Sequence, residues 1–287
     1  MAEVEVESAD GSRSHRLSLP LAPAKPLFGD WPRGDSRLLE GIVGYLRIAR
    51  MDDDPAFVDS ILAALDRFAG ARGLVIDVRG NGGGCRVLIP RLFSRFLGSK
   101  DPPRIGNVAA SRLREGEDPA RPGGYLADRF LFPASSPHWS PVERRAVEAF
   151  ARSFRPAWTP PSGEFSRWHY FVIAPPASAA PFGAPVVVLM DDGCFSATDI
   201  FLGTFKGWRK VTFLRTPSGG GSGRARPATL ARSGIRVQLS SMASFRPDGT
   251  LYDGEGVEPD VLVEREPEDL VGKGDAQLAS ALARLGR

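Results

Sequence analysis

Gly73-Leu-Val-Ile-Asp-Val-Arg-Gly-Asn-Gly-Gly-Gly84 is the segment of the chain that is most informative about its fold. Its first half is a nearly continuous apolar run, which is typical of a strand buried on both faces of a parallel sheet. Residues 41–48 also predict a strand, and a helix begins between the two at Asp54-Pro55, with an acid at the cap and proline at the first position. A strand, a helix and a strand in this order indicate a parallel sheet, so the expected fold class is α/β.

The same pattern of strand, turn and helix recurs later in the chain. The apolar run Pro185–Met190 leads into Asp191-Asp-Gly-Cys-Phe-Ser-Ala-Thr-Asp199, which turns into a helix ending near Gly207. Another strand follows at 211–214, and a second glycine-rich loop spans 216–223. The carboxyl ends of parallel strands share one edge of a sheet, where open α/β folds place their ligands. Both glycine-rich loops are therefore expected at that edge.

The segments outside these motifs have other sequence patterns. Alternating residues over 3–19 predict a β-hairpin, and a Pro-rich linker follows, so residues 1–35 are interpreted as a separate part, a possible remnant of an upstream domain, and 36–287 as the core. Residues 99–182 are Pro-rich and predict an irregular inserted lid with one helix over 140–154. The C-terminal part predicts the following elements: a hairpin of 235–239 with 242–245, an edge strand over 261–263, and a helix over 275–285.

Composition excludes several classes of function. The 287 residues carry 37 basic and 34 acidic side chains spread along the chain, so the formal charge of +3 predicts no nucleic-acid groove. The longest apolar run, 186–190, is too short for a membrane span, and the N-terminus as written shows no signal peptide, so the compartment stays open. Neither glycine loop matches a phosphate-binding pattern. The two cysteines, Cys85 and Cys194, are expected to stay reduced, and we expect no metal and no cofactor.

Two features could carry chemistry. Ser196 stands at the first turn of a helix, where its hydroxyl would face unsatisfied N–H groups that favour an anionic intermediate. The alternative is that Ser196 only caps this helix. The successive glycines of 80–84 allow backbone N–H groups to converge on an oxyanion, whereas the alternative is an ordinary turn between strand and helix.

The order of the motifs closely resembles the catalytic core of the C-terminal-processing (tail-specific) and tricorn serine peptidases. The motifs that carry the resemblance are Gly44-Tyr-Leu-Arg-Ile48, Leu74–Gly84, Val187–Asp199, Thr216-Pro-Ser-Gly-Gly-Gly221 and Asp253-Gly-Glu-Gly-Val-Glu-Pro-Asp-Val261. The resemblance covers residues 41–265 apart from the insertion, and it implies a crotonase-like αβ core. It also implies that Ser196 is the nucleophile, and that the N–H groups of Ala197 and of Gly83 or its neighbour Gly84 form the oxyanion hole.

One departure from the family concerns the base. Tail-specific members activate the serine with a lysine in a Thr-x-Gly-Lys-Gly loop, and this chain has glycine at all three positions of 219–221. What remains resembles the branch of tricorn and interphotoreceptor retinoid-binding protein, in which a histidine is the base and an acid before Gly-Val-x-Pro-Asp orients it. Asp253 holds the acid position, and the alternative is a surface turn. Lys206 and Lys210 come too early to replace the lysine and are expected to be solvated.

No histidine stands where this branch would need it. His15 lies in the N-terminal hairpin, out of register, and His138 and His169 lie in the insertion, where structural roles are expected. His169 is the best-placed of them if the insertion folds back over the cleft. Because an isolated serine hydroxyl is a poor nucleophile, we expect weak or no peptidase activity from this chain by itself.

The sequence therefore predicts a serine-type peptidase core that hydrolyses peptide bonds of a peptide or protein substrate through an acyl-enzyme on Ser196, with Asp253 as the orienting acid. One alternative is a non-catalytic module that binds a peptide or hydrophobic ligand in the same cleft. A third is thioester chemistry on a coenzyme A substrate, which the same fold supports. The oligomeric state cannot be inferred. For a nucleophilic Ser196, the glycine loop at 82–84 must lie directly beside its hydroxyl.

Overall fold

The computed structural model describes residues 2–7, 14–19, 36–40, 42–116, 118, 121, 123–178, 180–264, 266, 269 and 274–286. The chain divides into two compact units, one of residues 1–33 with 266–275 and one of 34–265 with 276–287. In the first unit, β1 (Ala2–Glu7) and β2 (Ser14–Leu19) pair antiparallel, with Val4 opposite Leu17. This confirms the hairpin, while its turn at 9–12 and the linker at 20–35 lie outside the described residues.

A six-stranded sheet organises the second unit, in the order β14-β10-β9-β5-β4-β3. Its strands are β3 (Arg37–Leu39), β4 (Val43–Arg47), β5 (Gly73–Asp77), β9 (Val186–Met190), β10 (Val211–Arg215) and β14 (Val261–Leu262). All neighbours pair parallel except β3, which runs antiparallel to β4 at one edge. The strand, helix and strand of the sequence thus form the parallel α/β sheet that was predicted.

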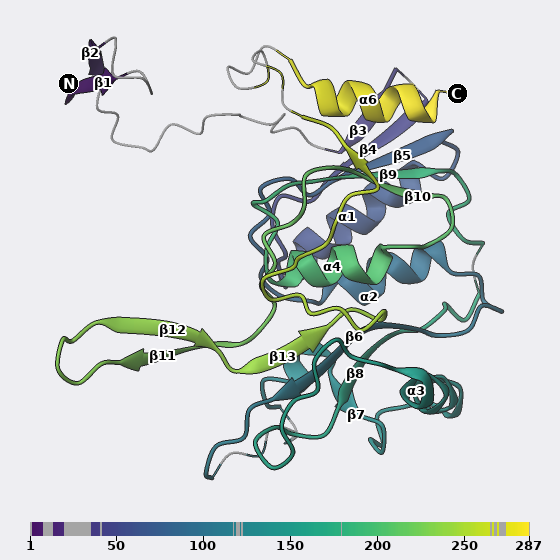
Figure 1. Cartoon of the computed structure of the whole chain (residues 1–287). Coiled ribbons are helices and arrows are strands. Elements are labelled where there is room, and N and C mark those ends of the chain that lie inside the picture. Colours follow the sequence, from purple (N-terminus) through teal and green to yellow (C-terminus); the bar gives the residue numbers. More distant parts are fainter. Residues whose placement is uncertain are drawn as a thin grey trace. The chain divides into compact units, whose positions relative to one another are not determined.

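Helices cover both faces of this sheet (Figure 1). On one face lie α1 (Pro55–Arg67), α2 (Leu88–Phe93) with the short 3-10 helix η1 (Ser94–Phe96), and α4 (Ala197–Phe205). On the other face α6 (Ala276–Leu285) packs its Ala281 against a cluster of strand residues that includes Val75 and Leu189. The parallel strands are therefore buried on both sides, which explains their continuous apolar sequences.

Beyond α2 and α4 lies a second, antiparallel sheet in the order β13-β6-β8-β7 (Figure 1). Its strands are β6 (Arg104–Ser111), β7 (Phe132–Pro133), β8 (His169–Ile173) and β13 (Met242–Phe245). The same region holds the 3-10 helix η2 (Ala127–Arg129) and the helix α3 (Pro141–Ser153), which has a complete capping box between Ser140 and Glu143. Helix α3 lies at about the expected residues, 140–154.

The expectation that 99–182 is irregular is wrong, because β6 and β8 from this segment form a buried layer of the molecule. Residues 106–111 of β6 are all buried, yet their sequence Gly-Asn-Val-Ala-Ala-Ser is small and partly polar, so it carries no hydrophobic run. The strand also has an irregular register between Ile105 and Asn107, which removes the simple alternation that a sequence reading depends on.

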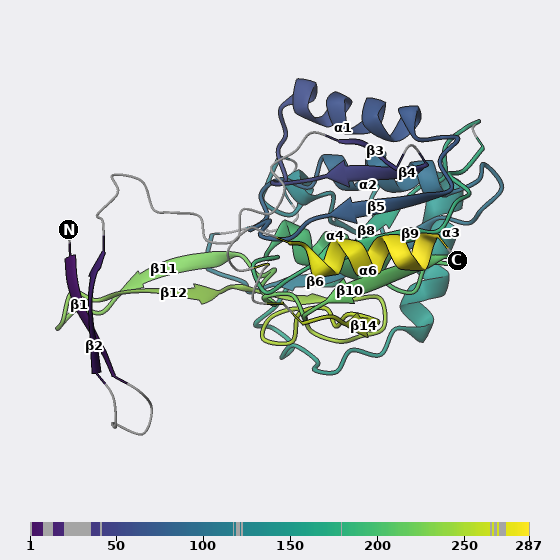
Figure 2. The same cartoon turned by 90° about the horizontal axis from the view of Figure 1, so that it is seen from above.

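The predicted hairpin of 235–239 with 242–245 is also wrong. Strand β12 (Arg236–Ser240) pairs instead with β11 (Ala225–Thr229), and the two form an arm that extends from the body of this unit (Figures 1 and 2). Strand β13 pairs with β6, where all four of its residues are buried. Pairing with β6 buries β13 on both faces, whereas a hairpin with β12 would not. Local sequence does not reveal this long-range pairing.

An aromatic cluster joins α2 to α4 in the centre of the core. The ring of Phe93 lies 4.5 Å from that of Phe205, 4.7 Å from Phe201 and 5.7 Å from Trp208. We expect Phe93→Ala to lower the free energy of unfolding by about 3–5 kcal/mol, because the substitution removes these contacts and leaves a cavity. Urea denaturation measures the change. Val142→Ala, at a side chain half exposed on α3, is the control, and an equal loss in both variants would contradict the central role of the cluster.

Candidate active site

Ser196 occupies the turn between β9 and α4, with φ 60° and ψ −116°. Positive φ is unusual for a residue with a side chain and marks a constrained turn. Its hydroxyl accepts no hydrogen bond from the first turn of α4. The interpretation of Ser196 as a mere helix cap is therefore wrong, and the hydroxyl remains available beside the amino end of the helix.

The first glycine loop lies directly against this turn, as the sequence predicted. A Cβ atom built on Gly83 would stand 2.8 Å from the Cβ of Ser196 and 2.9 Å from the amide nitrogen of Ala197. Gly83 also has φ +98°, so a side chain is excluded there by both conformation and space. The two loops approach this closely only because the position is glycine.

The amide groups of this region differ in their availability. The N–H of Gly83 donates to Oδ1 of Asn81 at 3.0 Å, and the Asn81 side chain in turn donates to the carbonyl of Ile48 at 2.9 Å. Within the described part of the chain, the N–H groups of Gly84 and Ala197 have no acceptor. Of the three expected oxyanion donors, these two are the ones free to bind a further oxygen.

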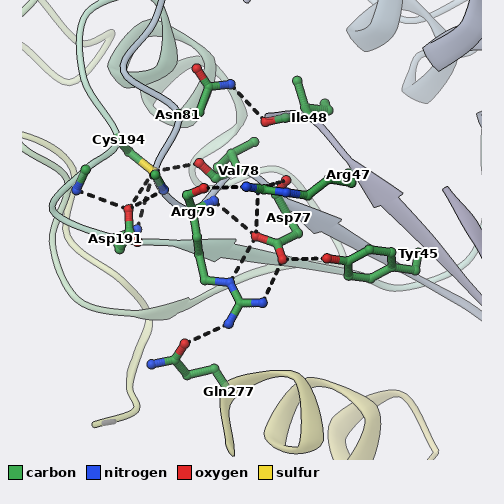
Figure 3. A network of polar contacts seen from close by, with 12 residues as sticks. Tyr45, Arg47, Ile48, Asp77, Val78, Arg79, Asn81, Asp191, Cys194 and Gln277 are labelled. Atoms are coloured by element: carbon green, nitrogen blue, oxygen red, sulfur yellow. Dashed lines mark hydrogen bonds and ion pairs between the residues drawn. The ribbon is translucent and has the colours of Figure 1, made fainter. Parts of the chain in front are cut away.

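A buried carboxylate anchors the start of the loop. Asp77 is fully buried at the end of β5 and accepts hydrogen bonds from the hydroxyl of Tyr45, from the side chain of Arg79 and from Nη1 of Arg47 (Figure 3). Burial works to raise its pKa, but the two guanidinium charges and these hydrogen bonds outweigh burial and hold the pKa below its usual value. Arg79 reaches α6 as well, where Nη1 donates to Gln277 at 2.8 Å.

A second buried carboxylate ties the glycine loop to the serine turn. Oδ1 of Asp191 accepts the N–H of Gly80 at 2.7 Å and of Gly193 at 3.1 Å, and its Oδ2 accepts from Arg215 of β10 at 2.6 Å. The thiol of Cys194 donates to the carbonyl of Val78 at 3.1 Å across the same junction (Figure 3). These contacts hold together the carboxyl ends of β5, β9 and β10.

Both cysteines are free, as expected. Cys194 is buried, and burial together with the neighbouring Asp191 raises the pKa of its thiol well above the usual value. Cys85 is exposed beside Gly84, and partial burial of its sulfur and the charge of Asp53 raise its pKa. Neither thiol is therefore activated as a nucleophile.

The second glycine loop is held by a third acid. Asp199, on the first turn of α4, accepts the hydroxyl of Ser218 at 2.5 Å and the N–H of Gly221 at 2.9 Å. Burial raises the pKa of Asp199 although these hydrogen bonds oppose the rise. Asp77, Asp191 and Asp199 were not among the site residues predicted from the sequence. An acid inside an apolar strand or at the start of an apolar helix was the signal that could have revealed them, since such a charge needs partners.

The loop has no room for the lysine of the tail-specific peptidases. A Cβ on Gly220 would meet the amide nitrogen of Gly256 at 2.6 Å, and one on Gly219 would meet the carbonyl of Asp192 at 2.8 Å. On Gly221 it would lie 2.0 Å from the ring of Phe195, whose side chain is 46% exposed next to Ser196. Backbone atoms therefore exclude a side chain at Gly219 and Gly220, whereas at Gly221 the half-exposed ring of Phe195 would have to move.

Asp253 lies beside this loop. Its Oδ1 accepts the N–H groups of Ser222 at 3.2 Å and of Gly223 at 3.1 Å, and burial raises the pKa of its carboxyl. Asp253 is half-buried, unlike an acid in a free surface turn. Its observed contacts fix the glycine loop, and one carboxylate oxygen, Oδ2, carries no hydrogen bond within the described residues.

No base contacts Ser196 among the described side chains. His169 lies buried in β8 with Nδ1 2.8 Å from the carbonyl of Arg167, and His138 stacks on Phe132. The side chain of His15 is outside the described residues. Lys206 donates to the carbonyl of Glu258, and Lys210 to that of Gly183. Both bonds lie at exposed positions, as expected for surface lysines.

Comparison with known proteins identifies the family. The model of peptidase family S41 matches residues 42–263, which is most of the chain. The chain belongs to peptidase family S41. Its S41 core therefore includes the parallel sheet, both glycine loops and the serine turn, in agreement with the resemblance seen in the sequence.

Individual relatives cover parts of this S41 chain. It is 32% identical over 89 residues to a carboxy-terminal-processing protease of Bartonella bacilliformis, a match of 31% of this chain and 20% of the relative. A putative peptidase from Parabacteroides merdae superposes with a TM-score of 0.60 at 20% identity, over 87% of this chain and 62% of its own. Mature CPAF in complex with lactacystin superposes with a TM-score of 0.57 at 19% sequence identity. The match covers 99% of this chain and 53% of the CPAF chain. The chain thus spans a fifth of the curated relative and little more than half of the solved structures.

Two further features of the described residues concern metal ions and membranes. Their His, Cys, Asp and Glu side chains form no group able to hold a metal ion. None of their helices combines the length and the apolar character that a membrane crossing needs.

We expect Asp77→Asn to lower the free energy of unfolding by about 3–5 kcal/mol at neutral pH, because Arg79 would keep a buried charge without its counterion. The pKa of Asp77 is lowered in the folded state from its ordinary 3.8, so its contribution is complete above that value and disappears as pH falls through the folded pKa. Urea denaturation between pH 3 and 7 measures this. The wild type should lose more stability than the variant on acidification. Asp59→Asn, at the exposed pair with Arg91, is the control and should change little.

We expect Gly220→Ala to lower the melting temperature, because a residue with a side chain at φ +68° costs about 1–3 kcal/mol and its Cβ would collide with the Gly256 amide. Thermal unfolding followed by circular dichroism measures the effect. Gly70→Ala is a matched control, since a Cβ there meets nothing within 4 Å. Equal melting temperatures for the two variants would show that the loop tolerates a side chain.

Proposed function

We propose that this chain is a serine-type peptidase core, built on a crotonase-like arrangement, that hydrolyses peptide bonds of a peptide or protein substrate through an acyl-enzyme on Ser196. Membership in family S41 supports a peptidase function. The observation that carries the proposal is the contact of Gly83 with Ser196 and Ala197, which brings a constrained serine and the unbonded amide of Ala197 against the loop that also carries the unbonded amide of Gly84.

In the proposed reaction the Ser196 hydroxyl attacks the carbonyl carbon of the scissile bond. The carbonyl oxygen becomes an oxyanion, and the N–H groups of Ala197 and Gly84 donate hydrogen bonds to it. Ala197 is the first residue of α4, so the partial positive charge of the helix end adds to this stabilisation. Because the loops are fixed by Asp77, Asp191 and Asn81, the donors need no rearrangement as the charge develops.

The proton of Ser196 must go to a base before or during the attack. We propose that Asp253 is the acid that orients this base, through the carboxylate oxygen that the glycine loop leaves unused. The described side chains contribute no imidazole or amine to Ser196. We therefore expect this chain by itself to turn over peptides slowly or not at all, because a serine without its base loses orders of magnitude in rate.

The same absence supports one alternative function. A site with oxyanion donors but no base among the described residues would hold a peptide without cleaving it, and Phe195 offers an exposed aromatic ring beside the serine. On this alternative the chain is a module that binds a peptide or a hydrophobic ligand.

Covalent labelling separates the two functions. A fluorophosphonate probe should label the chain at Ser196, at a rate well below that of a complete serine peptidase, and Ser196→Ala should remove the label. Ser222→Ala, at a serine of the neighbouring loop, should keep it. Complete resistance to the probe would contradict the nucleophile assignment and favour the binding module. Rapid casein hydrolysis that Ser196→Ala abolishes would instead show that a base is present.

A further inference from the structure

The arm formed by β11 and β12 has one apolar face. Residues that stand opposite each other in a ladder project on the same side of the sheet, and the register sets Ala228 opposite Val237. Leu230, Ile235 and Leu239 lie on that same side and are 50%, 58% and 62% exposed. A two-stranded ribbon is only marginally stable in water, whereas three or more strands with a hydrophobic face are stable. Both facts favour a further strand beside the arm.

The hydrogen bonds of the arm show which edge could take that strand. Near the tip, the N–H of Leu230 donates to the carbonyl of Ile235 at 2.9 Å. Hydrogen-bonded and non-hydrogen-bonded pairs alternate along an antiparallel ladder, so every second residue of β12 turns its N–H and C=O away from β11. These residues are Arg236, Gln238 and Ser240. Within the described part of the chain, the edge that they form pairs with no other strand.

The opposite edge of the arm is protected. Pro227 stands in the middle of β11, opposite Gln238, so its missing N–H falls on the outer edge of that strand. Proline in an edge strand is one of the means by which proteins prevent pairing with another chain. Strand β12 contains no proline. A further strand can therefore be added beside β12 but not beside β11.

The open edge of β12 is complementary to itself. In an antiparallel pairing of two copies about Val237, this residue lies opposite its own equivalent, and Ile235 lies opposite Leu239 of the second copy. On the other face, Arg236 lies opposite Gln238 of the second copy, whose side-chain oxygen can accept a hydrogen bond from the guanidinium. Apolar side chains thus meet apolar ones, and no charges of like sign stand opposite each other.

The neighbouring registers match less well. Pairing about Arg236 would set the two guanidinium groups directly opposite each other, and like charges in that position destabilise a sheet. Pairing about Gln238 would set Ile235 opposite Ser241, a buried polar residue at the base of the arm. The register about Val237 is therefore the one that continues the apolar face from one copy to the other.

We propose that the arm is a dimerisation element, in which β12 pairs antiparallel with β12 of a second copy about Val237 and the two arms form one four-stranded sheet. A second copy is the occupant because a two-fold interface requires a surface that is its own complement, and this edge is one in its backbone groups, its apolar face and its charges. The inference does not depend on the role of Ser196.

Sedimentation velocity over a series of protein concentrations measures association of the full chain, and we expect a reversible equilibrium of monomer and dimer. Gln238→Glu should tighten the dimer about fivefold and Gln238→Arg should weaken it about fivefold, because each places a charge opposite Arg236 of the second copy at two points of the interface. The matched controls are Ala225→Glu and Ala225→Arg, which add the same charges on β11. They should leave the dissociation constant unchanged.

A disulfide tests the register. Val237 hydrogen-bonds to β11, so it would face its equivalent as a non-hydrogen-bonded pair with Cα atoms about 4.5 Å apart, which suits a disulfide. Val237→Cys is made with Cys85→Ser, which removes the exposed native thiol. Oxidation with diamide should then give a covalent dimer on a non-reducing gel. Ala228→Cys, on the same face but one strand further from the second copy, should give none.

Four results would overturn the proposal. The first is a folded wild type that stays monomeric at every concentration, and the second is a change of the same sign in Gln238→Glu and Gln238→Arg. The third is cross-linking of Ala228→Cys as complete as that of Val237→Cys. The last is a monomer that binds an unrelated extended peptide along β12, which would assign the open edge to another partner. Circular dichroism melting verifies that each variant is folded.

Discussion

The carboxylate of Asp77 has no exposed surface, and a buried charge is tolerated only when partners surround it. Tyr45 and Arg47 from β4 and Arg79 from the loop meet that demand, so the end of β5 and the first turn of the glycine loop are fixed together. Asp191 then repeats the arrangement one strand further, between the loop and the serine turn. The backbone around Ser196 is thus held in place by the partners that the buried carboxylates of Asp77 and Asp191 require.

Much of the sheet and the serine turn could be predicted from the sequence, because strands buried on both faces carry continuous apolar runs and glycines mark close backbone contacts. The second sheet could not. Strand β6 is buried although its residues are small and partly polar, so its sequence does not indicate burial. Strand β13 does not pair with its sequence neighbour β12 but with β6, more than a hundred residues away. The buried acids do stand out as charges within apolar segments, but the sequence does not show the arginines that fold toward them.

The proposed acyl transfer has two requirements, stabilisation of an oxyanion and transfer of a proton, and different groups would meet them. Stabilisation of an oxyanion depends on backbone amides, and those around Ala197 and Gly84 are held by contacts that the described residues already make. Proton transfer depends on a side chain with a suitable pKa, and the described residues offer none at Ser196. The loops that would supply these amides lie within the S41 match.

The contact between Phe195 and Gly221 also has an evolutionary meaning. A side chain at Gly221 would overlap the aromatic ring, and the ring rests where only glycine leaves space. Each residue therefore limits the substitutions that the other tolerates. A larger residue at Gly221 requires the half-exposed ring of Phe195 to turn away or to be replaced, so the two positions are expected to covary among relatives.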